Sequence, residues 1–169
     1  MIMIENAILV SKTAHAAVGQ IRKYSGDPYF VHPERVARTV AYYGGSEDQI
    51  AAAYMHDVVE DTAVSLDFIR AEFGDAIADI VDDLTDVSRP EDGNRAQRKA
   101  IDRDHTASAS QEAQFVKAAD IIDNSSDIAD NDPDFWKVYQ KEMLLTLDAM
   151  SKIKGSDIWN HALKSVQGE

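Results

Sequence analysis

The sequence contains no cysteine, and this absence excludes disulfide bonds and thiolate chemistry. It also has no apolar run near the ~20 residues that a membrane-spanning helix requires. Residues 1–5 lack the basic segment and the apolar length of a secretory signal. We therefore expect a cytoplasmic protein without a membrane partner.

Basic residues are also scarce, with 17 lysines and arginines against 30 acidic residues and a net charge of −13. Nucleic-acid binding without sequence preference needs a basic surface that displaces counterions. The charge balance therefore argues against a nucleic-acid partner. A small polyanionic substrate is compatible with this chain only where basic residues gather locally.

The chain has 169 residues, 44% of them hydrophobic, which is typical of one globular domain. Its apolar residues recur at helical spacing, and no convincing period-two strand is present. We predict an all-α single domain over residues 1–169. The predicted helices cover residues 5–22, 33–43, 46–62, 65–72, 75–84, 94–106, 111–130, 134–152 and 156–166.

Residues 49–62 begin as an uncharged, alanine-rich helix and then supply four ionisable groups. At about 100° per residue, these four side chains fall within a sector of about 140° on a continuous helix. The four residues are His56, Asp57, Glu60 and Asp61. Burying them is costly unless a cation binds there. The alternative is a solvated run of carboxylates near a helix end.

Two further residues have the chemistry of metal ligands. His32 precedes Pro33, which fixes the backbone, although a histidine at a helix start also serves as a cap or a packed surface residue. Asp120 lies inside an apolar helical sequence, where a carboxylate needs a partner. Asn124 and Asp127 share its face and suggest a pocket wall; a salt-bridged interior helix is the alternative.

His32, His56, Asp57 and Asp120 together form a mixed nitrogen and oxygen ligand set. Such a set suits manganese, iron or zinc better than calcium. The order His…His-Asp…Asp resembles the signature of the HD phosphohydrolase superfamily.

Three segments resemble RelA/SpoT-type alarmone hydrolase domains more closely. Residues 19–33 are similar to the opening segment of those domains. Residues 56–62 look like their His-Asp-x-x-Glu-Asp-Thr motif, and residues 117–124 resemble their Lys-Leu-Ala-Asp-x-x-x-Asn motif. The resemblance runs from about residue 5 to 150 and leaves no room for synthetase or regulatory domains. The chain therefore looks like a stand-alone small alarmone hydrolase.

This resemblance implies an HD-domain helical bundle with one bound Mn²⁺. It implies hydrolysis of the 3′-diphosphate of (p)ppGpp, which releases pyrophosphate and GDP or GTP. The implied metal ligands are the four residues named above, and Glu60 and Asp61 are the implied catalytic pair. The implied substrate-binding residues are Arg22, Lys23, Arg98, Lys99 and Asn124.

Some alternatives stay open at this point. Asp123 and Asp127 depart from the family pattern, so the base preference is not fixed. The same site would suit (p)ppApp, NADPH or a deoxynucleotide, or a non-catalytic regulator that binds metal or nucleotide. Arg22 and Lys23 could instead stabilise the dipole at the end of a first helix. The sequence carries no signal for oligomeric state.

Overall fold

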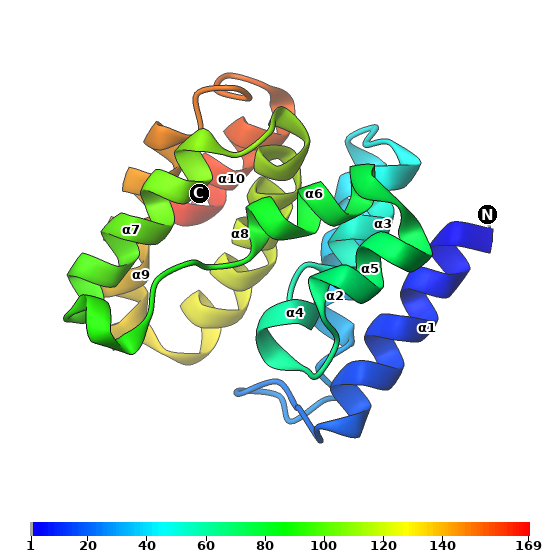
Figure 1. Ribbon diagram of the computed structural model, residues 1–169. Coiled ribbons are helices and arrows are strands. Elements are labelled where there is room, and N and C mark those ends of the chain that lie inside the picture. Colours follow the sequence, from blue (N-terminus) through cyan, green and yellow to red (C-terminus); the bar gives the residue numbers. More distant parts are fainter. Residues whose placement is uncertain (1) are drawn as a thin grey trace. The chain divides into compact units, whose positions relative to one another are not determined.

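The computed structural model describes residues 2–169, and within this range it is helical (Figure 1). The described residues form no β-strand, and their one isolated bridge pairs Ile21 with Pro28. None of their helices has the length and apolar character needed to cross a bilayer. The all-α prediction is confirmed.

The helices have the following bounds: α1 Ile2–Ala17, α2 Val31–Tyr42, α3 Glu47–Met55, α4 Val58–Asp61, α5 Leu66–Phe73, α6 Asp75–Leu84, η1 Pro90–Asp92, α7 Arg95–Ser108, α8 Gln111–Asn131, α9 Pro133–Ala149 and α10 Asp157–Gln167. Contacts divide the chain between Thr85 and Asp86 into two compact units. The single domain over residues 1–169 stays a prediction.

Local capping explains most of the helix starts. At the start of α3, the Ser46 side chain accepts from the Gln49 N–H, and the Gln49 side chain accepts from the Ser46 N–H. This reciprocal pair satisfies backbone donors that the first turn leaves unpaired. In five further helices the side chain of the capping residue accepts from a backbone N–H of the first turn, at Ser65, Asn94, Ser110, Asp132 and Ser156.

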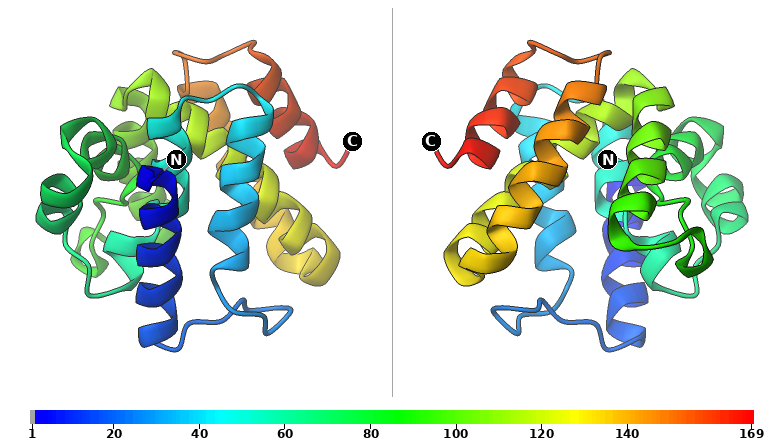
Figure 2. Two further views of the ribbon diagram at one scale, coloured as in Figure 1. Left: turned by 90° about the vertical axis from the view of Figure 1, so that its right-hand side faces the viewer. Right: turned by 90° about the vertical axis from the view of Figure 1, so that its left-hand side faces the viewer.

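The first unit is built around α3, which packs against α1, α2 and α6. Ala51, Ala52 and Ala53 are fully buried, and their small side chains let the neighbouring helices approach closely. Figure 2 shows α1 and α2, in dark and light blue, joined at one end by the loop of residues 18–30. This loop and the segment that follows α3, residues 56–61, carry most of the predicted site residues of the first unit.

Two predicted helices of the first unit end at least five residues earlier than expected. The first was predicted over residues 5–22 but ends at Ala17, because Gly19 takes φ +66 and turns the chain. The helix predicted over residues 46–62 is also wrong, since α3 ends at Met55 and α4 begins only at Val58.

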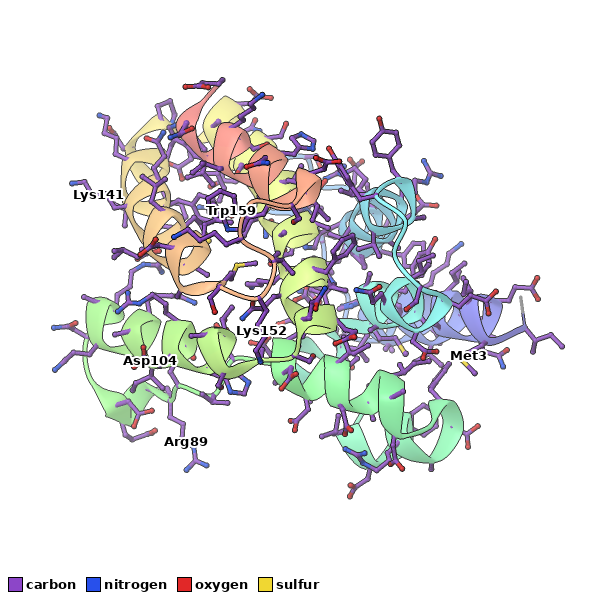
Figure 3. All side chains as sticks on the ribbon, turned by 90° about the horizontal axis from the view of Figure 1, so that it is seen from above. Met3, Arg89, Asp104, Lys141, Lys152 and Trp159 are labelled. Atoms are coloured by element: carbon purple, nitrogen blue, oxygen red, sulfur yellow. The ribbon has the colours of Figure 1, made fainter. Side chains whose placement is uncertain are left out.

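In the second unit, α9 packs against α7, α8 and α10, and α8 also packs against α10. Lys152 Nζ donates to the carbonyls of Ser108 and Ala109 at the end of α7. Trp159 Nε1 donates to the Leu147 carbonyl at 2.9 Å. Both Lys152 and Trp159 are labelled in Figure 3. Arg89 directly precedes the short helix η1, and its side chain points away from the ribbon (Figure 3).

Candidate metal centre

Three of the four predicted ligands meet in the first unit. His32 comes from the first turn of α2, His56 follows the last residue of α3, and Asp57 is the next residue. His32 Nε2 and His56 Nε2 lie 3.2 Å apart, and Asp57 Oδ2 lies 3.1 Å from His56 Nε2 and 3.6 Å from His32 Nε2. Both histidines are buried. The three atoms form a compact triangle of possible ligands.

The triangle fits a divalent cation. Ligand atoms about 2.1 Å from one ion lie about 3.0 Å apart at right angles and about 3.4 Å apart in a tetrahedron. His56 Nδ1 lies 2.7 Å from the Ala53 carbonyl, so Nδ1 carries the proton and the Nε2 lone pair faces the triangle. The buried Nε2 atoms of His32 and His56 lie only 3.2 Å apart, so a proton or a cation must lie between their lone pairs.

The backbone between α3 and α4 departs from regular helix. Asp57 has φ −100 and ψ −3, in the sparsely populated bridge region where many active-site residues lie. Counting 100° per residue from His56 to Asp61 is therefore not valid. The prediction of one shared helix face is wrong, although His56 and Asp57 do come together.

Tyr29 supports the triangle from the loop before α2. Its hydroxyl donates to Asp57 Oδ2 at 2.5 Å, and its ring lies 4.7 Å from the ring of His15 and 5.8 Å from that of His32. A partner of this kind fixes the orientation of a ligating carboxylate. Tyr29 was not predicted from the sequence, because no spacing rule brings it to a residue 28 positions away.

Glu60 and Asp61, the predicted catalytic pair, lie on the single turn of α4, and both are exposed. Asp61 Oδ2 accepts a hydrogen bond of 2.9 Å from Gln20 Nε2. Gln20, like Tyr29, was not predicted from the sequence. The catalytic roles of Glu60 and Asp61 stay predictions.

Arg22 and Lys23 lie in the loop of residues 18–30 and not in the last turn of α1. The alternative in which they stabilise the dipole of that helix is therefore wrong, since α1 ends at Ala17. Arg22 is only 8% exposed, and its guanidinium lies 5.7 Å from the centre of the Tyr29 ring. Lys23 Nζ lies 4.7 Å from the centre of the Tyr24 ring. Their role in substrate binding stays a prediction.

Asp120 belongs to the second unit, where it lies buried on α8. Lys117 Nζ donates to its Oδ2 at 2.9 Å, and Asn124 Nδ2 donates to its Oδ1 at 2.6 Å. Burial raises the pKa of the Tyr139 hydroxyl, and the charge of Asp120 raises it further. Asp120 as fourth ligand and Asn124 as substrate contact stay predictions.

Arg98 and Lys99 lie on α7, also in the second unit. Lys99 Nζ lies 3.0 Å from Asp86 Oδ2 and 3.6 Å from Asp102 Oδ2, so two carboxylates offset its charge. Arg98 donates to the Gly93 carbonyl at 3.3 Å. Their predicted contact with substrate stays a prediction.

Comparison with known proteins identifies the family. The chain matches the HD domain family over residues 7–145. It is 35% identical over 111 residues to the guanosine-3′,5′-bis(diphosphate) 3′-pyrophosphohydrolase MESH1 of Xenopus tropicalis, covering 64% of this chain and 60% of that protein. It is 37% identical over 123 residues to a probable GTP pyrophosphokinase of Mycobacterium leprae, covering 72% of this chain and 15% of that protein. The chain thus spans 60% or less of the length of these relatives.

A solved structure supports the same fold. It is described as a metazoan ortholog of SpoT that hydrolyses ppGpp and acts in starvation responses; the TM-score is 0.79 at 24% identity, over 97% of this chain and 93% of that one. The HD match and the triangle of His32, His56 and Asp57 both indicate binding of a divalent metal. The match over residues 7–145 and the shared fold show that this chain belongs to the HD domain family.

Proposed function

We propose that this chain hydrolyses (p)ppGpp at the 3′-diphosphate, releasing pyrophosphate and GDP or GTP. The observation that carries the proposal is the triangle of His32, His56 and Asp57, followed within four residues by Glu60 and Asp61. The similarity to MESH1, a 3′-pyrophosphohydrolase by name, supports the choice of substrate.

We propose Mn²⁺ as the metal, with Asp120 joining the triangle as fourth ligand. Imidazole nitrogens and carboxylate oxygens together suit a borderline cation of this kind. A cation held there supplies Lewis-acid polarisation of the phosphoryl group and a water of lowered pKa. Tyr29 holds Asp57 in place through its hydroxyl.

The reaction joins a water oxygen to the 3′-phosphorus and breaks the bond from that phosphorus to the 3′ oxygen. One proton must leave the water, and one must reach the departing 3′ oxygen. Glu60 and Asp61 are the proposed groups for these transfers, since two neighbouring carboxylates can divide the work of base and acid. The attacked phosphate leaves with its partner as pyrophosphate.

The diphosphate must be held by local positive charge in a chain of net charge −13. Arg22 and Lys23 are the proposed residues of the first unit for this role, because cationic donors bind phosphate oxygens strongly. Arg98, Lys99 and Asn124 are the proposed substrate contacts from the second unit.

The test is to incubate the purified protein with ppGpp, with Mn²⁺ and with a chelator, and to identify the products. We expect GDP and pyrophosphate with Mn²⁺, and no turnover with the chelator. The double variant Glu60→Gln and Asp61→Asn should lose turnover and still bind nucleotide. The matched control removes two exposed charges from α5, as Asp67→Asn and Glu72→Gln, and should keep full turnover.

Other products would redirect the proposal. Orthophosphate from NADPH or from a deoxynucleotide, without pyrophosphate from ppGpp, would contradict it, and a preference for (p)ppApp would change the base. Nucleotide binding without turnover would make the chain a regulator. A cytoplasmic location, a small-molecule nucleotide partner and the absence of nucleic-acid and membrane partners stay predictions.

A further inference from the structure

The end of α1 brings two polar side chains of the first unit together. Gly19 N–H donates to the Ala16 carbonyl at 3.0 Å, and Gln20 N–H donates to the His15 carbonyl at 3.1 Å. This pair of bonds, with Gly19 at φ +66, is the Schellman ending of a helix. It folds Gln20 back over the last turn, where Gln20 Oε1 lies 2.7 Å from His15 Nδ1.

The two ends of the Gln20 amide have different partners. The carboxylate of Asp61 only accepts hydrogen bonds when ionised, so the amide must direct its Nε2 to Asp61, at 2.9 Å. Its Oε1 then faces His15 and requires a proton on Nδ1. His15 is 1% exposed, and its Nε2 has no hydrogen-bond partner among the described residues, which favours the tautomer with the proton on Nδ1. A flipped amide would place an oxygen against the carboxylate.

We propose that Gln20 is a positioning residue for Asp61 and that His15 fixes the direction of its amide. This inference rests on the proposed function, in which Asp61 is a catalytic carboxylate. Asp61 is the last residue of a one-turn helix and is exposed, so its own helix restrains it little. The Gln20 amide ties this side chain to the buried end of α1.

The Gln20 side chain is not needed to hold the loop of residues 18–30. The backbone of Gln20 is fixed on both sides, by its N–H on the His15 carbonyl and by the Tyr29 N–H on its own carbonyl at 3.2 Å. Removing only the amide should therefore leave the loop in place and release Asp61. This separation makes the proposal testable.

The kinetic test is a double-mutant cycle of Gln20→Met and Asp61→Asn with ppGpp as substrate. Met keeps the length and bulk of the side chain and removes its donor. We expect Gln20→Met to lower kcat about tenfold and to leave KM within about twofold, because the interaction acts on the catalytic group. In the Asp61→Asn background the same change should have no further effect on residual turnover. An equal loss in both backgrounds would overturn the proposal.

Two further variants sharpen the result. His15→Phe keeps a ring against Tyr29 but cannot fix the amide, so we expect a kcat between those of Gln20→Met and the parent protein. Gln111→Met changes an exposed glutamine at the start of α8 and should leave kcat unchanged. A parent-like kcat in Gln20→Met would also overturn the proposal.

A measurement that does not need turnover separates this inference from the proposed function. The carboxyl ¹³C signal of Asp61, assigned by its loss in Asp61→Asn, is recorded at one pH in the parent and in Gln20→Met. The signal should move in Gln20→Met and stay in place in Gln111→Met. An unmoved signal refutes the positioning role, whereas a moved signal in a protein that does not cleave ppGpp refutes only the function.

Discussion

Metal binding should stabilise this protein measurably, and the triangle of His32, His56 and Asp57 gives the reason. Two imidazole nitrogens and a carboxylate oxygen converge within 3.1 to 3.6 Å, with both histidines buried. A cation bound among them is lost when the chain unfolds. At 100 times its Kd it adds about 2.7 kcal/mol to the free energy of unfolding. For a chain of this size each kcal/mol raises Tm by about 2–4 °C, so the expected rise is about 5–11 °C.

The assay compares the Tm of chelator-treated protein before and after titration with Mn²⁺. The variant His32→Ala should lose most of the Mn²⁺-induced rise, whatever its own Tm without metal, because one corner of the triangle is gone. His161→Ala removes an exposed histidine from α10 and should retain the rise. The reasoning is refuted if Mn²⁺ leaves the parent Tm unchanged, or if His32→Ala shows the full rise.

Three further changes test the surroundings of the site and of the second unit. Tyr29→Phe removes the donor to Asp57 and should raise the Kd for Mn²⁺ about 10- to 100-fold, as measured by calorimetry. Gly19→Ala forces a side chain into φ +66 and should cost about 1 kcal/mol of unfolding free energy in urea. Asp102→Asn should cost about 1–3 kcal/mol at pH 7, because the carboxylate accepts from the N–H and hydroxyl of Ser88. Burial acts to raise the pKa of Asp102, but the Ser88 hydrogen bonds, the charge of Lys99 and a hydrogen bond with Asp86 together outweigh burial and lower that pKa below 3.8. The stabilisation that the ionised Asp102 carboxylate adds to the folded state is therefore complete at pH values above 3.8. It disappears as the pH falls through the lowered pKa.

Specific results would contradict these expectations. An unchanged Kd in Tyr29→Phe would mean that Asp57 needs no support from that hydroxyl. A neutral Gly19→Ala would show that the loop relaxes without strain. For Asp102→Asn, a loss of unfolding free energy that is as large at pH 2 as at pH 7 would contradict the expectation. It would mean that the substitution acts through the packing of the side chain and not through its charge.

The helices of the second unit and α6 were predicted well, for identifiable reasons. The helix predicted over residues 75–84 has those same bounds, because Gly74 at φ +88 separates it from α5 and a regular apolar face follows. The helix predicted over residues 111–130 ends one residue later, at Asn131. In both, a local start signal agrees with a 3.6-residue apolar period: Gly74 precedes α6, and the Ser110 side chain caps α8.

The first helix was predicted too long because apolar residues continue its period beyond Ala17. Val18 and Ile21 fit the period, yet they are 50% and 61% exposed. A period of apolar residues predicts a helix only where those residues find a core to bury against. Here α1 ends because Gly19 takes a positive φ, which is a local property of the backbone and not of the apolar period.

The candidate ligands His32, His56 and Asp57 could be predicted from residue type and from family resemblance. Tyr29 and Gln20 could not, because their contacts join residues 28 and 41 positions apart through single hydrogen bonds. No periodic pattern encodes such contacts. They follow only after the loop of residues 18–30 has folded against α3 and α4.

The two places where the helix predictions failed are also the places that build the site. On a continuous helix, residues 15 and 20 lie about 140° apart, so the His15 to Gln20 hydrogen bond would not form. The ending at Gly19 brings them within 2.7 Å. Likewise, the break at Asp57 starts a new helix that presents Glu60 and Asp61 independently of α3. Departures from regular periodicity are expected where function needs side chains that a regular helix would separate.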